Sequence, residues 1–417
     1  MGKRVLIIGA GVIGLSTAYY AARRGHQVTV VDRNPERRDG CSFGNAGMIV
    51  PSHFTPLAAP GMIALGLKWM WNPESPFYVK PRLSPELLSW GIKFWQAATP
   101  AHVQRAALLI RDLSLASRKC FEELAELPGN DFGLVKKGLL MLCKSQHALE
   151  EEAKTAQQAR NLGIPAEVLT FRDTASLDPN VTMDIAGSVY FPLDCHFSPS
   201  RFMESLQGLA ANAGTQFVWE TEVKGWQTQA GIISAVATNH GILRADEYVL
   251  CGGSWSPCTA RGLELNIPLQ AGKGYSLTLA RPPELPSICS ILTEARVAIT
   301  PIGSALRIGG TMEIAGLNEH INPVRLQGII KAVPNYYPKF KPEHFVGIQP
   351  WCGLRPCSPD GLPYVGRTRR YRNLLLATGH AMMGMSLGPI TGKLVSQLLS
   401  GEASAIALDQ LNPDRYL

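Results

Sequence analysis

The feature that most constrains this chain is a glycine-rich turn between a predicted strand and a predicted helix near its start. Val5 to Ile8 form a short apolar run that suits a strand buried on both faces. Three glycines follow with the spacing G-x-G-x-x-G, at Gly9, Gly11 and Gly14. The first permits a tight turn, the second leaves room for a pyrophosphate against the backbone, and the third lets the helix pack closely on the strand.

A second strand and an acidic residue complete this pattern. The helix is predicted to end at Arg23-Arg24-Gly25, because basic residues and glycine favour a helix C-terminus. The next apolar strand, Val28 to Val31, leads into Asp32, which lies 23 positions after Gly9. A carboxylate at this point can accept hydrogen bonds from the ribose hydroxyls of adenosine. The sequence therefore predicts a site for an ADP-containing dinucleotide, and composition does not distinguish NAD from FAD.

Length and composition set the broad class. The 417 residues are too many for one ordinary core, so two closely connected domains are expected. The nine cysteines are odd in number and show no framework of close pairs, and the chain starts with a predicted strand rather than a signal peptide. We therefore expect a cytoplasmic protein without a membrane span and without a metal site. The net charge of +7 comes from scattered Lys and Arg, which makes nucleic acid an unlikely partner class, whereas anionic substrates or an anionic membrane surface fit it.

A loop of small residues after the second strand is a candidate for cofactor contact. It reads Cys41-Ser42-Phe43-Gly44-Asn45-Ala46-Gly47-Met48. Such residues let a backbone lie against a flat ring, and their amides can hydrogen-bond a cofactor. A plain surface loop is the competing interpretation, but the position directly after a dinucleotide-binding strand favours cofactor contact.

Later segments predict that the cofactor domain is assembled from separated parts of the chain. A helix at 199–213 leads to a strand near 217–219, and Glu247 to Cys251 form another buried strand. A last strand, Leu374 to Ala377, precedes a glycine-containing turn at 379–385 and a helix through Leu399. This turn offers free N–H groups and the positive end of a helix dipole, which suit the N1–C2=O edge of a reduced, anionic flavin.

The region between Ile267 and Gly310 predicts a second domain built on an antiparallel sheet. We expect an α/β fold, with α+β character in the second domain, in which a Rossmann-like domain contains an inserted, mostly antiparallel substrate domain. The predicted boundaries are 1–53, 164–262 and 346–417 for the cofactor domain, and 54–163 and 263–345 for the substrate or cap domain.

Residues 54–98 differ in character from the rest of the chain. They contain four of the eight tryptophans, interleaved with basic residues and prolines. One interpretation is a cap that packs over a substrate pocket, and the other is an amphipathic surface that meets a membrane. The cap is favoured, because buried tryptophan is ordinary core material. The residues concerned are Trp69, Trp71, Trp90 and Trp95, with Lys68, Lys80, Arg82 and Lys93.

Several short motifs are spread over nearly the whole chain. They are GAGVIG with Asp32, SFGNAG (42–47), PLAAPG (56–61), KWMW (68–71), GKGYSLT (272–278), RIGGTMEIAG (307–316), LRPCSPDGLPYVG (354–366) and TGH (378–380). In these motifs the chain resembles the superfamily of FAD-dependent D-amino-acid oxidases and dehydrogenases, and within it the bacterial D-amino-acid dehydrogenases of the small-subunit type. The resemblance implies FAD as the cofactor and a glutathione-reductase-type FAD fold.

The same resemblance implies roles for individual residues. Arg355 occupies the position that binds the substrate carboxylate, for which a guanidinium offers a planar, permanently charged fork. Tyr275 and His53 are further candidate substrate contacts, for which a packing role is an equal alternative. The implied cofactor residues are Gly9, Gly11, Val12, Ile13, Gly14, Asp32 and Arg33 for ADP, Val223, Gly252, Gly253 and Trp255 beside them, Ser42, Asn45, Ala46, Gly47 and Met48 at the flavin, and Gly379, His380, Met382, Met383, Gly384 and Met385 at its pyrimidine edge.

Two departures from the family pattern bear on substrate and cofactor attachment. The familiar ending GHGTLGWTM is here GHAMMGMSLGPITG, so that an aromatic position has become Met385. This leaves room for a cyclic substrate such as D-proline or 4-hydroxy-D-proline. Related sarcosine oxidases attach the flavin to a cysteine near the segment GLRP, where this chain has Gly353, so noncovalent FAD is expected, with Cys352 as the competing possibility.

The resulting hypothesis is an FAD-dependent dehydrogenase that oxidises a D-amino acid by hydride transfer from Cα to flavin N5. The imine would be hydrolysed to a keto acid where the substrate is acyclic, and a quinone-type acceptor would take the electrons, with peripheral contact at the inner face of the cell membrane. The alternatives are a glycine or N-methyl-amino-acid oxidase that uses oxygen, and a noncatalytic flavoprotein subunit.

Overall fold

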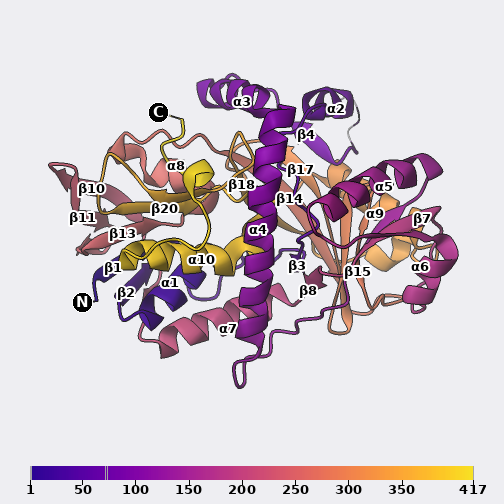
Figure 1. The fold of residues 1–417 in the computed structure, drawn as a ribbon, viewed down its shortest axis with the longest axis horizontal. Helices are drawn as coiled ribbons and strands as arrows, with labels where there is room; N and C mark the ends of the chain where they lie inside the picture. The colour runs from indigo at the N-terminus through magenta and orange to yellow at the C-terminus, as the bar shows by residue number, and fades with distance from the viewer. Residues whose placement is uncertain (1, 71, 73, 417) are drawn as a thin grey trace.

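Two large β-sheets organise the fold, one of them parallel and the other mostly antiparallel (Figure 1). The structure, a computed structural model, describes residues 2–70, 72 and 74–416. The first sheet has six strands in the order β19-β20-β13-β1-β2-β9, of which only β19 is antiparallel to its neighbour. Its strands are β1 (Arg4–Ile8), β2 (Gln27–Val31), β9 (Gln216–Val218), β13 (Glu247–Leu250), β19 (Tyr364–Arg367) and β20 (Leu374–Thr378).

Helices cover one face of this sheet and a small sheet covers the other. Apolar side chains of β1, β2 and β13 pack in one core with α1, α4, α7 and α10. Leu6, Ile8 and Tyr248 on the opposite face pack against Ile233 and Val236 of the small sheet. These elements are α1 (Val12–Arg23), α4 (Pro100–Ala125), α7 (Pro199–Asn212), α10 (Gly384–Ser400), β10 (Val223–Gln229), β11 (Ile232–Thr238) and β12 (Gly241–Leu243).

The second sheet has nine strands and lies across the long helix α4 from the first (Figure 1). Its main path is β18-β14-β17-β16-β15-β5-β7-β6, and β4 pairs with β17. Helix α9 (Pro323–Tyr336) packs on one of its faces. The strands are β4 (Phe77–Val79), β5 (Leu139–Cys143), β6 (Glu167–Thr170), β7 (Gly187–Phe191), β14 (Gln270–Leu279), β15 (Cys289–Leu292), β16 (Val297–Ile302), β17 (Ala305–Ile314) and β18 (Trp351–Cys357).

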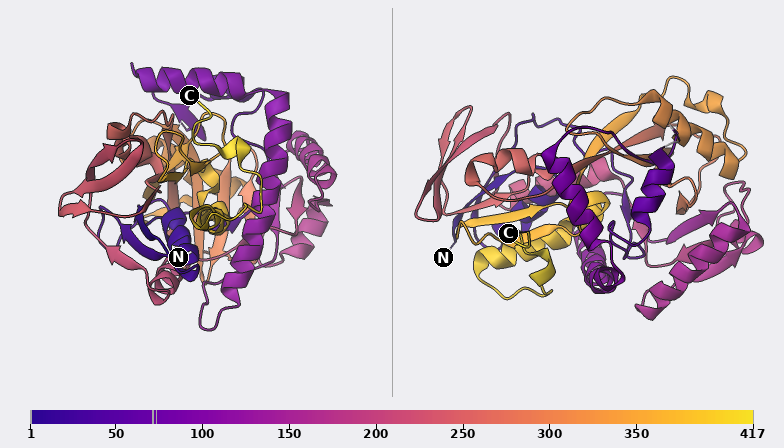
Figure 2. Two further views of the ribbon diagram at one scale, coloured as in Figure 1. Left: turned by 60° about the vertical axis from the view of Figure 1, so that its left-hand side comes forward. Right: turned by 90° about the horizontal axis from the view of Figure 1, so that it is seen from above.

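Shorter elements connect and flank the two sheets. Figure 2 shows from above that α2 and α3 both lie on the face of the molecule toward the viewer, separated from each other. The remaining helices and strands are α2 (Met62–Met70), α3 (Pro85–Ala97), α5 (Gln146–Asn161), α6 (Phe171–Leu177), α8 (Ser256–Thr259), β3 (Met48–Ile49) and β8 (Cys195–His196), with 3-10 turns at Gly253–Trp255, Arg261–Leu263, Pro342–Phe345, Ala381–Met383 and Asp409–Leu411.

The predicted α/β fold and its antiparallel second sheet are confirmed, but strand membership differs from the predicted domain boundaries. β6 and β7 fall in the range assigned to the cofactor domain, as does β18, yet all three belong to the nine-stranded sheet. The reason is hydrogen bonding at long range: β7 pairs with β5, and β18 pairs with β14. By strand pairing, β6, β7 and β18 therefore belong with the sheet of the predicted substrate domain, not with the parallel sheet.

The tryptophans of the segment 54–98 divide between packing and exposure. Trp90 is buried, and its indole N–H donates to the carbonyl of Cys357 at 2.9 Å. Trp95, on the same helix, is exposed. Trp71 lies outside the described residues. The inner side of α3 is therefore packed, as expected for a cap, whereas its outer side is exposed.

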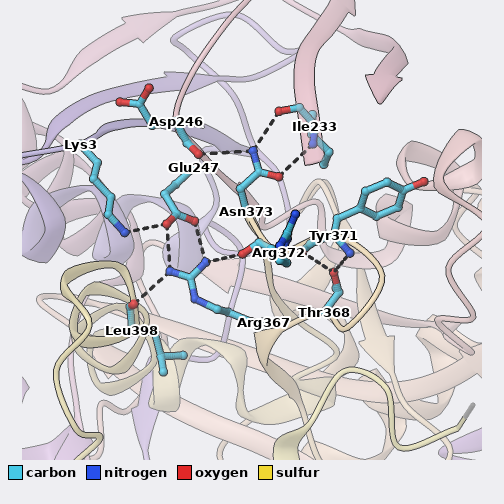
Figure 3. A network of polar contacts seen from close by, with 10 residues as sticks. All are labelled: Lys3, Ile233, Asp246, Glu247, Arg367, Thr368, Tyr371, Arg372, Asn373 and Leu398. Atoms are coloured by element: carbon cyan, nitrogen blue, oxygen red, sulfur yellow. Dashed lines mark hydrogen bonds and ion pairs between the residues drawn. The ribbon is translucent and has the colours of Figure 1, made fainter. Parts of the chain in front are cut away.

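A buried carboxylate joins distant elements at the amino-terminal edge of the parallel sheet (Figure 3). Both carboxylate oxygens of Glu247 accept hydrogen bonds from Arg367, at 2.7 and 3.0 Å, and one also accepts from Lys3 at 2.7 Å. The Arg367 guanidinium donates further to the carbonyls of Arg372 and Leu398. This network ties the start of the chain, β13, β19 and the end of α10 together.

We expect Glu247→Gln to lower the free energy of unfolding by about 1–2 kcal/mol, because two cations would lose their shared anion. The shift of the urea midpoint at unchanged slope measures this effect. Arg4→Gln, which removes the exposed pair of Arg4 with Asp246, is the matched control and should leave the midpoint almost unchanged. Equal shifts for the two variants would contradict the structural role of the network.

Candidate functional site

A cavity of about 1320 Å³ opens at the carboxyl ends of the parallel strands. Its wall includes the residues that end β1, β2, β13 and β20 or follow them directly, such as Ile8, Asp32, Cys251 and Thr378. In open α/β sheets, ligands bind at this edge. The cavity extends from the glycine turn to β18, because Gly9 and Arg355 both line it.

The glycine turn at the start of α1 leaves the backbone exposed to the cavity. Gly9 has φ +107°, which favours glycine, and a Cβ on Gly14 would lie 1.8 Å from the carbonyl oxygen of Gly9. A Cβ on Gly11 would meet nothing nearer than the Ser42 hydroxyl at 3.7 Å. Gly11 caps α1 without a side-chain hydrogen bond, and the first turn of the helix carries no acid. This cradle suits a pyrophosphate, which a helix N-terminus attracts.

Asp32 and its neighbours form the part of the cavity for which the sequence predicts adenosine binding. One Asp32 carboxylate oxygen accepts from the amide of Ala10 at 2.7 Å, and the other accepts from the amide of Asn34 at 2.9 Å. The carboxylate is thereby held at the cavity wall with further lone pairs for ribose hydroxyls. The Arg33 guanidinium lies 4.1 Å from the ring centroid of Trp255, and both residues line the cavity.

A second helix N-terminus faces the same cavity. α10 begins at Gly384 after the turn Ala381–Met383, and its N-cap residue, Met383, makes no side-chain capping hydrogen bond. His380 lines the cavity, and its Nε2 pairs with the Thr391 hydroxyl at 3.0 Å, whereas its buried Nδ1 has no partner in the described part of the chain. Burial lowers the pKa of His380 to about 3, so the ring is neutral. An orphaned ring nitrogen beside exposed helix amides indicates a polar ligand here.

The loop of small residues is fixed by the nine-stranded sheet. The Arg307 guanidinium donates to the carbonyls of Phe43 and Asn45, at 3.0 and 2.9 Å. The Asn45 side chain accepts from the amide of Gly47 at 2.8 Å, so this amide closes a turn. The Ser42 hydroxyl accepts from the amide of Val12 at 3.1 Å. The competing interpretation of a plain surface loop does not apply, because Ser42 and Asn45 line the cavity.

Arg355 stands beside the turn that opens α10. A β-bridge joins Cys357 of the same strand to His380. One Arg355 Nη donates to the carbonyl of Thr311 at 2.6 Å, and a Cβ on Gly274 would lie only 2.2 Å from the guanidinium. No carboxylate of the described residues lies within 4 Å of it. Burial lowers the pKa of Arg355 from its ordinary value, although a guanidinium stays charged. A partly buried cation without an anion is suited to an anionic ligand.

Tyr275 is not brought to Arg355. Arg355 pairs with Gly272 and shares a sheet face with Gly274, so Tyr275 points to the opposite face of β14. Its hydroxyl is buried and donates to Glu313 at 2.7 Å. Tyr275 does not line the cavity, and the structure gives it a packing and hydrogen-bonding position behind the sheet.

His53 also lies outside the cavity lining, in a chain of buried polar groups. The Ser52 hydroxyl donates to the buried Asp194 carboxylate. The Ser52 oxygen also lies 2.9 Å from His53 Nδ1, within hydrogen-bond distance. Burial lowers the pKa of His53 to about 4 and raises that of Asp194 to about 7. The ring of His53 is thus neutral.

Most of the predicted cofactor residues meet at the cavity. Those that line it are Gly9, Gly11, Val12, Ile13, Asp32, Arg33, Ser42, Asn45, Val223, Gly252, Gly253, Trp255, His380, Met382, Gly384 and Met385. The others, Gly14, Ala46, Gly47, Met48, Gly379 and Met383, are absent from its lining.

The sequence reasoning missed several lining residues, among them Arg38 and Gln207. The Arg38 guanidinium donates to the carbonyl of Ala10 at 2.9 Å and lies 4.5 Å from the ring centroid of Trp219. No spacing in the sequence could have found it, because tertiary contacts alone bring Arg38 to the glycine turn.

The chain is similar to known proteins over almost its whole length. Residues 4–398 match the family described as FAD dependent oxidoreductase. The chain is 32% identical over 419 residues to the D-amino acid dehydrogenase of Paramagnetospirillum magneticum, with 99% of each protein covered. It is also 32% identical over 426 residues to the D-amino acid dehydrogenase of Bradyrhizobium diazoefficiens, again with 99% of each covered.

Solved structures share the fold. Glycine oxidase from Geobacillus kaustophilus superposes with a TM-score of 0.79 at 24% identity, covering 100% of this chain and 99% of that one. L-proline dehydrogenase from P. horikoshii gives a TM-score of 0.77 at 16% identity, covering 100% and 98%. At such identities the likeness shows the architecture alone. The two helix N-termini, Asp32 and the orphaned His380 nitrogen fit FAD as the ligand of the cavity.

We expect Asp32→Ala to weaken FAD binding roughly ten- to hundredfold, because hydrogen bonds to a charged acceptor contribute about 1.5–3 kcal/mol. Titration of the apoprotein with FAD, followed by flavin fluorescence, measures the dissociation constant. Asp246→Ala, at an exposed carboxylate just before β13, is the matched control and should bind FAD as the wild type does. An unchanged affinity in Asp32→Ala would remove Asp32 from the ribose role.

Proposed function

Because this chain belongs to the family of FAD-dependent oxidoreductases, we propose that it is a dehydrogenase that oxidises a D-amino acid. The observation that carries the proposal is Arg355, a guanidinium with no carboxylate partner among the described residues, at the end of the cavity where α10 begins. The full-length relatives named D-amino acid dehydrogenase support the D-configuration.

The residues around Arg355 fit the binding of a carboxylate. A guanidinium offers two parallel N–H groups to the two carboxylate oxygens, and the carbonyl of Thr311 orients it by accepting from one Nη. Gly274 leaves the space that the guanidinium needs. When bound, FAD supplies the acceptor for the hydride that leaves Cα of the substrate. The protein's part is to anchor the carboxylate so that Cα–H points at this acceptor.

An apolar cluster close to Arg355, of which Ala381 lines the cavity, supports a substrate with a small apolar or cyclic side chain. Trp90, Met312, Cys357 and Ala381 pack in one buried cluster. Met385, which stands where the family has an aromatic residue, is buried and lines the cavity. Methionine adapts to irregular shapes. We therefore propose a cyclic D-amino acid, D-proline or 4-hydroxy-D-proline, as the preferred substrate class.

The proposal includes noncovalent FAD. Gly353 stands at the position where a covalent link would need a cysteine, and Cys41 and Cys352 also line the cavity. Burial raises the pKa of both thiols, which keeps them protonated and poorly nucleophilic.

The proposed electron acceptor is a quinone, reached at a membrane surface by peripheral contact. The support is the word dehydrogenase in the names of the full-length relatives. No helix of the described residues is long and apolar enough to cross a bilayer. The second candidate function is an oxygen-using oxidase of glycine or an N-methyl amino acid, which the shared fold with glycine oxidase favours. A noncatalytic flavoprotein subunit is disfavoured by the intact Arg355 site.

We expect Arg355→Leu to lower kcat/KM about a hundredfold or more while FAD content stays unchanged, since a bidentate charged contact would be lost. Arg355→Lys should recover only part of the activity, because an ammonium cannot form the fork. Steady-state kinetics with a soluble dye measure both. The exposed Arg370→Leu is the control and should behave as the wild type. Near-normal kinetics in Arg355→Leu would refute the carboxylate site.

We expect anaerobic D-proline or 4-hydroxy-D-proline to bleach the flavin absorbance, and the L-enantiomers and glycine to leave it unchanged. The reduced enzyme should then be reoxidised faster by a ubiquinone analogue than by oxygen. Stopped-flow absorbance measures both half-reactions. Bleaching by glycine or sarcosine with rapid peroxide formation would instead establish the oxidase. Absence of bleaching by every amino acid tested would support the noncatalytic subunit.

A further inference from the structure

Helix α3 has two apolar faces, and the described residues cover only one of them. Leu87, Trp90 and Phe94 pack inward against the cluster beside Arg355. Leu88, Ile92 and Trp95 follow the helical spacing i, i+4, i+7, so they share the outer face. Their exposed fractions are 68%, 48% and 67%. A soluble helix usually turns polar residues outward, so this outer stripe is suited to contact with another apolar surface.

The neighbouring helix α2 repeats this arrangement. Ile63 and Leu67, one turn apart, are exposed, and Gly66 is its one buried residue. Leu83, just before α3, is fully exposed. Both helices stand at the top of Figure 1 and face the viewer in the right panel of Figure 2. The two helices that carry most of these exposed apolar residues therefore lie at the same end of the molecule. We name this surface, made of Ile63, Leu67, Leu83, Leu88, Ile92 and Trp95, the α2–α3 face.

The charged residues in this segment are mainly basic. Residues 54–98 contain four basic and two acidic side chains. None of the four basic ones is ion-paired within the described residues, whereas Glu74 is paired with Lys331. Lys68 and Lys80 are exposed, and Lys93 lies on α3 itself. A second copy of this chain seated on the α2–α3 face would bring these like charges together, while anionic lipid would complement them.

We propose that the α2–α3 face docks the enzyme on an anionic lipid bilayer, with the apolar stripe of α3 in the headgroup layer. Tryptophan at the end of such a stripe favours this layer, and lysines beside it meet lipid phosphates. The occupant is the bilayer surface, and no part of the chain needs to cross it. The inference deepens the proposed function, because it assigns to one surface the membrane contact that a quinone acceptor requires.

The docked surface adjoins the substrate end of the cavity. The Trp90 indole donates to the carbonyl of Cys357, two residues from Arg355 in β18. The connection between α2 and α3 contains β4, which pairs with β17 at Met312 to Ile314, next to the Thr311 carbonyl that holds Arg355. Docking through this face therefore sets the substrate end of the enzyme against the bilayer, where a lipid-dissolved quinone would be.

Co-sedimentation of the FAD-loaded protein with phosphatidylglycerol–phosphatidylcholine vesicles tests this proposal. The wild type should pellet with these vesicles at low salt and less at high salt or with phosphatidylcholine alone. The triple variant Leu88→Ser, Ile92→Ser, Trp95→Ser should have a vesicle partition coefficient at least roughly tenfold lower than that of the wild type, since three exposed apolar side chains are lost. Val168→Ser, Phe171→Ser, Leu177→Ser, which removes three exposed apolar residues near α6, is the matched control and should bind as the wild type does.

A second measurement keeps the proposal open to refutation if the triple variant is unstable. Lipids with brominated chains should quench wild-type tryptophan fluorescence more than that of Trp95→Phe. Failure of the wild type to bind anionic vesicles, or equal binding by wild type and the α3 triple variant, would overturn the proposal. A vesicle-free dimer that the α3 variant converts to monomer would also overturn it, with a second copy as the occupant. Dye reduction by D-amino acids without vesicles tests the proposed activity separately, since the α3 variant should retain it.

Discussion

The close packing of α1 on β1 and on α10 fixes the geometry on which the cofactor cavity depends. A Cβ on Gly14 would lie 1.8 Å from the Gly9 carbonyl oxygen, and one on Gly392 would lie 2.3 Å from the backbone of Ser16. The two helices are thus held nearly in backbone contact, and both begin at the same edge of the parallel sheet. Their N-termini converge on one cavity because neither helix can shift along the other without a clash.

Much of the first sheet could be predicted from the sequence, because its signals are local. The strand, glycines and helix that begin the chain follow one another within 20 residues, and each element takes the conformation that its own residues favour. Membership in the second sheet was harder to predict. Which strand β18 joins depends on hydrogen bonds to β14, some 80 positions earlier, and no periodicity within β18 specifies that partner.

The candidate site likewise has features that could be predicted from local motifs and features that only tertiary contacts determine. The glycines, Asp32 and the turn before α10 carry their chemistry in short motifs, and the structure gathers most of them at one cavity. The orientation of Tyr275 could not be read from its motif, because alternation in a strand says which residues share a face but not which face meets the cofactor. Only the pairing of Gly272 with Arg355 decides that. The exposure of one apolar face of α3 was equally hidden, since Leu88 and Leu87 are chemically identical in the sequence and differ only in what covers them.

The hydrogen bond from the Trp90 indole to the Cys357 carbonyl has a thermodynamic consequence. It couples a surface helix to the strand that carries Arg355, so a shift of α3 and the occupancy of the proposed amino-acid site would act on the same strand. If occupancy on one side changes the affinity on the other by some factor, the reverse effect must have the same factor, because coupling free energy is reciprocal. A substrate that strengthened the contact between β18 and α3 would then change the affinity of the outer face of α3 for the surface that it contacts. The amino acid would in that case act as an allosteric effector of the enzyme's own location.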